Sequence, residues 1–95
     1  MTTAHASVDI DDARVRVTTW SFARNGDATG PHLHDYDYVV IPVTGGTFTV
    51  TNADGTTREM IQHPGSPYRG TAGTNHNVVN SSSAAAVFVE VELKI

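Results

Sequence analysis

The sequence contains no cysteine, and it has only six basic residues against ten acidic ones. Without cysteine the fold is not a disulfide scaffold, and any metal site must use nitrogen and oxygen ligands. A formal net charge of -4 argues against nucleic acid and anionic membranes as partners. The first ten residues lack a basic stretch followed by an apolar run, and every apolar segment is too short to span a bilayer. We therefore expect a soluble, unexported, cytoplasmic protein whose partner is a small molecule.

The length of 95 residues gives room for one domain and for no separate cofactor domain. A chain this short buries only about two thirds of its unfolded surface, so a bound ion or a partner subunit would help to stabilise it. Residues 1–12 are polar and lack a clear period, which predicts a flexible N-terminal arm, either frayed or ordered on a neighbouring subunit. Residues 13–95 then form a β-barrel domain. The open strand edges of a small barrel, together with the unplaced arm, favour a homodimer.

Short strands separated by turn signals account for most of the domain. Residues 14–24 alternate and are rich in Val, Thr, Trp and Phe, as in a half-buried strand. Residues 32–44 are predicted as the next strand, with the apolar run 39–43 buried on both faces. Further strands are expected at residues 47–52, 56–63, 76–80 and 85–95, with a short segment at residues 67–70 between two loops.

The last strand alternates between two kinds of side chain. One face carries Val87, Val89, Val91 and Leu93. The other carries Glu90 and Glu92, which we expect to be exposed unless that face meets a second sheet. No segment shows a helical period, so the predicted fold class is all-β, a closed or sandwich-like barrel.

The histidines are the candidate chemical residues. His32 and His34 lie two apart on a predicted strand, so both side chains leave the same face with Cα atoms roughly 6.5 Å apart and can converge on one ion. A His-x-His pair alone is a weak signal, because such pairs also occur on solvated strand faces. A glycine-and-proline loop before the pair, and His76 after a second glycine turn, strengthen it. His5 and His63 lie in the terminus and in a loop, and we interpret both as solvated.

Two stretches resemble the motifs of the cupin family, the RmlC-like jelly-roll proteins. In the first motif a glycine precedes His-x-His, an acidic residue follows and a glycine closes the strand, and this chain has TGPHLHDYDYVVIPVTGG. In the second motif a glycine, Pro-x-Gly, a histidine and an asparagine follow in order, and this chain has GSPYRGTAGTNHNVVN, with Thr71 in place of the proline. Within the family, the sequence is most similar to small single-domain cupins associated with β-alanine degradation. The resemblance covers residues 29–80 and implies a single-domain jelly-roll barrel with a metal on His32, His34 and His76.

One position departs from the family pattern. Where the family usually has a metal-binding glutamate, four residues after His34, this chain has Tyr38. By alternation Tyr38 faces the same way as the histidine pair, and Asp37 faces away unless a bulge shifts the register. Three neutral histidines leave the ion its full charge, which favours an anionic, chelating substrate. Tyr38 is then a candidate catalytic residue, as a distant fourth ligand, a proton donor or a hydrogen-bonding wall.

The leading hypothesis from the sequence is a metal-dependent enzyme that acts on a small carboxylate or keto substrate. Its cofactor would be a divalent transition metal, Fe, Zn, Ni, Mn or Cu. Cupin dioxygenases acting on gentisate or cysteine resemble the three-histidine pattern, and isomerase, decarboxylase and hydrolase chemistry stay open. The alternatives are a non-catalytic small-molecule-binding or sensor cupin, a structural dimer stabilised by its metal, and histidines that are polar interior residues without metal. Mainly packing roles are expected for Trp20, Phe22, Phe48, Tyr68 and Phe88, with one or two at the mouth of the cavity.

Overall fold

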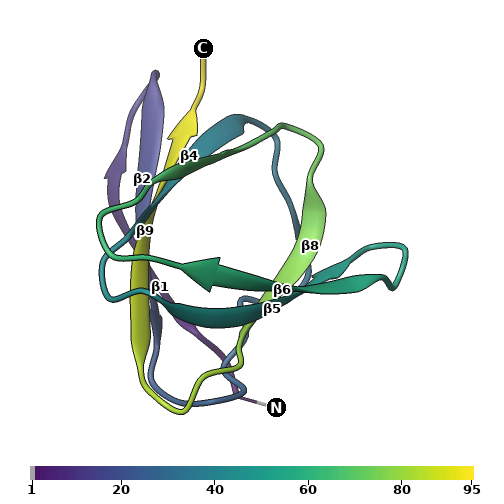
Figure 1. Ribbon diagram of the computed structural model, residues 1–95. Coiled ribbons are helices and arrows are strands. Elements are labelled where there is room, and N and C mark those ends of the chain that lie inside the picture. The colour runs from purple at the N-terminus through teal and green to yellow at the C-terminus, as the bar shows by residue number, and fades with distance from the viewer. Residues whose placement is uncertain (1) are drawn as a thin grey trace.

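The computed structural model describes residues 2–95, and within them every regular element is a strand. The strands are β1 His5–Asp11, β2 Val15–Phe22, β3 His32–Leu33, β4 Asp37–Pro42, β5 Gly46–Asn52, β6 Thr57–Gln62, β7 Tyr68–Gly70, β8 Asn75–Asn80 and β9 Ala86–Leu93. They form two sheets, ordered β1-β2-β9-β4-β7 and β3-β8-β5-β6, which face each other around the interior (Figure 1). Every strand pairing is antiparallel. The predicted all-β jelly-roll barrel is confirmed. No helix in residues 2–95 has the length and apolarity needed to cross a membrane.

Strand β1 lies where the sequence predicted a flexible arm. It pairs with β2 from His5 to Asp11, with a shift of register between Val8 and Ile10. The prediction that regular structure begins near Ala13 was therefore wrong, while Met1 lies outside the described residues. The physical reason is that β1 is an edge strand whose side chains are mostly exposed. Backbone hydrogen bonds hold it in the sheet, so its sequence does not need the apolar alternation of a half-buried strand.

The predicted strand 32–44 is in fact two strands in different sheets. β3 belongs to the four-stranded sheet and β4 to the five-stranded sheet, and the chain turns the corner between them at residues 34–36. The expectation that residues 39–43 are buried on both faces was also wrong, because Val40 is 3% exposed whereas Ile41 is 38% and Val43 53% exposed. Within residues 2–95, no second layer packs on the outer face of this sheet.

The last strand turns its two faces the other way from the prediction. Glu90 and Glu92, expected to be exposed, are each 8% exposed and point into the barrel together with Phe88. Their face meets the second sheet, which is the condition under which the prediction would fail. Arg16, which pairs with Glu92 across β2 and β9, binds its carboxylate through two hydrogen bonds of 2.9 Å.

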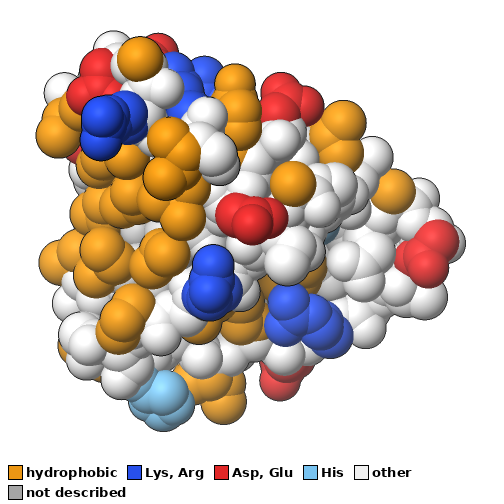
Figure 2. All heavy atoms as spheres, turned by 90° about the horizontal axis from the view of Figure 1, so that it is seen from above, with side chains coloured by type: hydrophobic (Ala, Val, Ile, Leu, Met, Phe, Trp, Pro, Cys, Tyr) orange, Lys and Arg blue, Asp and Glu red, His pale blue; other side chains and the backbone are white. Residues whose placement is uncertain are grey.

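The valines of β9 therefore face outward. They join a broad apolar surface on the outer face of the five-stranded sheet (Figure 2). Cross-strand pairs place Val17 and Val39 beside Val91, and Ile41 beside Val89. We call this surface, formed by outward-facing residues of β2, β4 and β9, the outer apolar face.

An aromatic cluster fills the centre of the barrel. The rings of Phe22, Phe48 and Phe88 lie 5.2, 5.5 and 5.8 Å apart between centroids and are at most 3% exposed, as expected for packing residues. Beside this cluster the interior is hollow, and Phe88 with Val50 forms part of the wall of a cavity.

Candidate metal centre and its cavity

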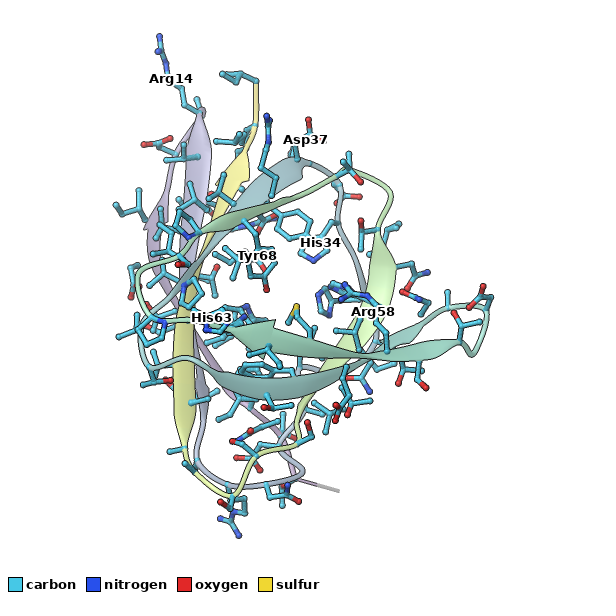
Figure 3. The ribbon with its side chains drawn as sticks, in the orientation of Figure 1. Arg14, His34, Asp37, Arg58, His63 and Tyr68 are labelled. Carbon is cyan, nitrogen blue, oxygen red and sulfur yellow. The ribbon has the colours of Figure 1, made fainter. Side chains whose placement is uncertain are left out.

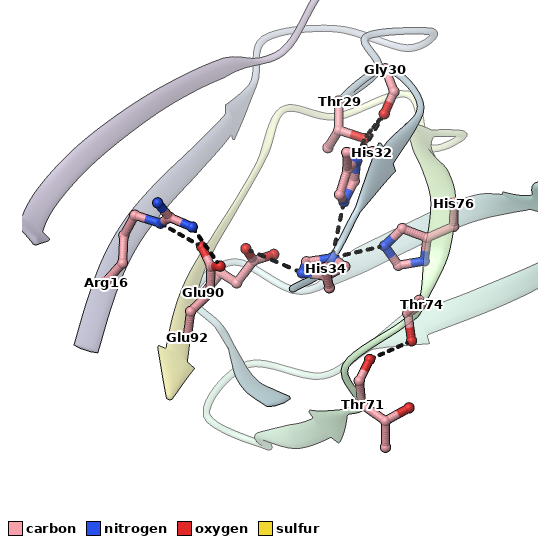
Figure 4. Close-up of polar contacts among 10 residues, drawn as sticks. All are labelled: Arg16, Thr29, Gly30, His32, His34, Thr71, Thr74, His76, Glu90 and Glu92. Atoms are coloured by element: carbon pink, nitrogen blue, oxygen red, sulfur yellow. Dashed lines mark hydrogen bonds and ion pairs between the residues drawn. The ribbon is translucent and has the colours of Figure 1, made fainter. Parts of the chain in front are cut away.

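Three histidines converge at one wall of the barrel (Figure 4). Antiparallel pairing of β3 with β8 sets His32 directly opposite His76, and His34 follows where the chain leaves β3. The His34 Nε2 atom lies 3.0 Å from His32 Nε2 and 3.2 Å from His76 Nε2. The sequence placed the first two on one face, and the fold brings the third to them.

The spacing and protonation of these nitrogens fit one metal ion. Imidazole nitrogens bind zinc at about 2.0–2.1 Å, so two nitrogens on one ion lie about 3.0–3.4 Å apart. His32 Nδ1 is 2.9 Å from the carbonyl oxygen of Gly30, which can only accept, so Nδ1 carries the proton and Nε2 keeps its lone pair. Burial, followed by the charge of His32, lowers the pKa of His34 and of His76 to about 4. Both rings are therefore neutral at pH 7, which is the state that binds metal.

A carboxyl group that sequence reasoning left outside the site lies behind His34. Glu90 Oε1 is 4.0 Å from His34 Nδ1. Burial, with the neighbouring charge of Glu92, raises the pKa of Glu90 to about 7. Because His34 is neutral and Glu90 is partly protonated at that pH, their contact is polar and is not a full ion pair. One signal in the sequence could have identified Glu90: it lies two residues after Phe88, a large apolar residue, and therefore on the same face of β9.

Tyr38 lies in the cavity, on the side that strand alternation predicted. Its ring stacks on that of His34, with centroids 3.8 Å apart and planes inclined by 16°. Burial raises the pKa of Tyr38, and the side chain of Thr74 partly offsets that rise. Asp37 faces outward, where it accepts a hydrogen bond of 2.8 Å from the backbone nitrogen of Ala72. Asp37 is therefore not a candidate ligand, and the catalytic role of Tyr38 stays a prediction.

His32 and His76 line a cavity of about 630 Å³ between the two sheets, and His34 is buried beside them. Tyr68 lines the cavity and accepts a hydrogen bond of 2.9 Å from Gln62 Nε2, while burial raises the pKa of Tyr68 to about 12. His63 is exposed, as expected, but also forms part of the cavity wall (Figure 3). The charged residues that border it are Arg58, Arg69 and Glu90, of which Arg69 pairs with the outward-facing Val39.

Comparisons with known proteins agree with this architecture. No family model matches the chain. It is 44% identical over 88 residues to the β-alanine degradation protein BauB of Pseudomonas aeruginosa. The aligned residues make up 93% of this chain and 90% of BauB. A cupin domain from Bordetella pertussis Tohama I superposes with a TM-score of 0.92 at 39% identity, covering 99% of this chain and 96% of the other. The polyketide cyclase RemF of Streptomyces resistomycificus shares the fold, with a TM-score of 0.70 at 22% identity over 99% of this chain and 69% of its own.

Proposed function

Because this chain belongs to the cupin family, we propose that it is a metal-dependent enzyme acting on a small carboxylate or keto compound. The observation that carries the proposal is the convergence of three imidazoles beside an interior cavity that His32 and His76 line. A merely structural set of histidines would instead use its lone pairs in hydrogen bonds to protein donors. Here the Nε2 atoms face one another, and one ring nitrogen from each histidine lies within 4.8 Å of the other two.

His32, His34 and His76 would hold the ion. When bound, a divalent transition metal supplies Lewis acidity toward an oxygen of the substrate, and a redox-active one adds chemistry with dioxygen. The Gly30 carbonyl fixes the ring of His32, and the stacked ring of Tyr38 fixes that of His34. Orientation by such outer contacts maintains the binding geometry of metal ligands.

Two groups beside His34 can transfer protons in the cavity. The carboxyl of Glu90 faces the Nδ1 side of the ring, and the phenol of Tyr38 lies over the ring plane. Both line the cavity, within reach of a substrate that faces the histidines. Water is restricted at this end because His34, Tyr38 and Glu90 are 3%, 5% and 8% exposed. A buried pair of this kind suits general acid–base catalysis.

The substrate class is supported by the size of the cavity and by one relative. A volume of about 630 Å³ lies within the usual range for small-molecule sites. BauB is described as a β-alanine degradation protein, and β-alanine is itself a small carboxylate. These observations favour a small carboxylate or its keto derivative, with oxidation by dioxygen as one possible reaction.

Elemental analysis of the purified protein tests the metal. We expect close to one transition-metal ion per chain in the parent and a large loss in His34→Ala, because that variant lacks the central ligand nitrogen.

The reaction is tested by incubating the iron-loaded protein with a mixture of small carboxylates and keto acids, with oxygen uptake and product NMR as readouts. Oxygen uptake indicates a dioxygenase, and a new product without oxygen uptake indicates another enzyme class. Ligand binding with no product would favour the alternative, a non-catalytic binding or sensor cupin, and absence of metal would overturn the proposal.

A further inference from the structure

A positively charged side chain lies on the interior-facing side of β6. Arg58 is paired with Val50, and two residues further along Met60 is paired with Phe48. Val50 and Phe48 are 1% and 0% exposed, so the face that Arg58 shares with them is the inner face of the sheet. Arg58 is itself exposed because it sits at the open end of this face, where it lines the cavity.

The register also fixes Arg58 relative to the histidines. β5 lies between β6 and β8, and it pairs Val50 with Val78 and Asn52 with His76. Arg58 and His76 are therefore two strands and two residues apart, or about 12 Å between Cα atoms. Both residues line the same cavity, so one small molecule can contact the guanidinium of Arg58 and the imidazole of His76 together.

The guanidinium of Arg58 has no acidic partner in residues 2–95. The ion pairs of that part of the chain join Arg16 to Glu92 and Lys94 to Asp11, and the polar contact of Glu90 is with His34. Burial is the main cause of the shifted pKa values of His76, Tyr38 and Tyr68, and the charge of Arg58 contributes to each. These three side chains come from β8, β4 and β7, so the charge acts across the cavity rather than along one wall.

The cavity holds a charge opposite in sign to the net charge of the protein. The chain has a formal net charge of -4, whereas Arg58 brings a positive charge to the cavity. Arg69 also borders the cavity, but it pairs with Val39 of the outer apolar face, so its side chain lies on the outside. The acidic residue of the lining, Glu90, lies at the inner end against His34. The open end therefore carries uncompensated positive charge, which draws anions to the cavity and repels cations.

We propose that Arg58 forms an anion subsite at the mouth of this cavity and binds a carboxylate group of the ligand. A guanidinium binds a carboxylate through two parallel N–H···O bonds, which fixes the orientation of the ligand as well as its charge. The ligand would be a short compound with a carboxylate at one end and an oxygen or nitrogen group at the other. That the second end faces a metal ion on the histidines rests on the proposed function, whereas the contact with Arg58 does not.

Titration calorimetry with succinate tests the subsite, on the metal-free and on the zinc-loaded protein. Arg58→Gln should weaken succinate binding about 10- to 100-fold in both forms, the range expected for losing hydrogen bonds to a charged group. The matched control is Arg14→Gln, which removes the same charge at an exposed turn far from the cavity and should bind succinate like the parent. The uncharged analogue succinamide should bind the parent as weakly as succinate binds Arg58→Gln.

A nitrogen NMR spectrum should show the Arg58 Nε–H signal shifting when succinate is added, and amide spectra of both variants check that they are folded.

Equal affinity of succinate for the parent and Arg58→Gln would overturn the subsite, as would absence of succinate binding in both forms of the parent. Equal binding of succinamide and succinate would do the same. The proposed function fails separately: if the parent retains no zinc but Arg58→Gln still loses succinate binding, the anion subsite stands without the metal. If zinc binds and the two variants have the same affinity for succinate, the subsite alone is wrong.

Discussion

The ring of Tyr38 lies against the backbone of Gly70, its partner across β4 and β7. A Cβ atom added at Gly70 would lie 1.9 Å from Tyr38 Cζ, far inside van der Waals contact. On its other side the same ring stacks on His34 at 3.8 Å. Tyr38 is thus held between a glycine and a candidate metal ligand, and the missing side chain at position 70 is what lets it lie flat.

Gly70→Ala should destabilise the protein by about 1–3 kcal/mol, the usual cost of overpacking a well-packed site. Urea unfolding measures the change in the free energy of unfolding. In a Tyr38→Ala background, where the clashing ring is absent, the same substitution should cost much less. If the two substitutions prove additive, Tyr38 and Gly70 are not coupled and the packing argument is wrong.

Tyr38→Phe tests whether the phenol takes part in function. It removes only the hydroxyl and keeps the stacked ring, so metal content should stay near that of the parent while turnover or ligand affinity falls. Elemental analysis and ligand titration provide the two readouts. Loss of metal from the Phe variant would make Tyr38 a ligand and contradict the three-histidine account. Behaviour like the parent in every assay would leave Tyr38 as a wall of the cavity only.

The stability of the metal-free protein should fall as the pH is lowered from about 6.5 toward 4. His34 and His76 have a pKa of about 4 in the fold against 6.5 in the unfolded chain, so the unfolded state takes up protons first. Glu90 acts in the opposite sense, because its pKa rises from 4.5 to about 7 and the fold keeps a proton that the unfolded chain loses.

Glu90→Gln removes the opposing contribution and should therefore steepen the loss of stability on acidification. Urea unfolding of the metal-free parent and variant, at several values between about pH 4.5 and 6.5, measures both slopes. A variant with the same slope as the parent would show that Glu90 ionises normally in the fold. The sign would be wrong altogether if the parent became more stable on acidification.

The outer apolar face predicts homodimerisation through the five-stranded sheet. Contiguous apolar surfaces of this kind mark interaction sites in soluble proteins, and the same face on a second copy is apolar as well. Sedimentation should show a dimer of the parent at micromolar concentration and a monomer of Ile41→Asp, since the substitution would bury an unpaired charge. Ile61→Asp is the control, because Ile61 is 64% exposed on the other sheet and should leave the dimer intact. A monomeric parent would contradict the prediction.

The sequence predicted the fold class and the pair His32 and His34 because both depend on short-range patterns. Alternation places His32 and His34 on one face whatever surrounds the strand, and glycine turns divide the chain into strands. His76 was found through its motif, since no local rule shows that it lies opposite His32. That pairing of β3 with β8 joins residues more than forty positions apart and depends on the order of strands in the sheet.

The tertiary structure decided which face of each strand is the inside. A period of two shows that Glu90 and Glu92 share a face, as do Arg58 and Met60, but it does not show which face meets the other sheet. β1 was missed for a related reason, because the backbone pairing that holds an edge strand does not require buried side chains. Burial is a property of two packed layers, and a strand examined alone contains only one of them. The groups that give the cavity its charge, Arg58 and Glu90, became visible only when the second layer was in place.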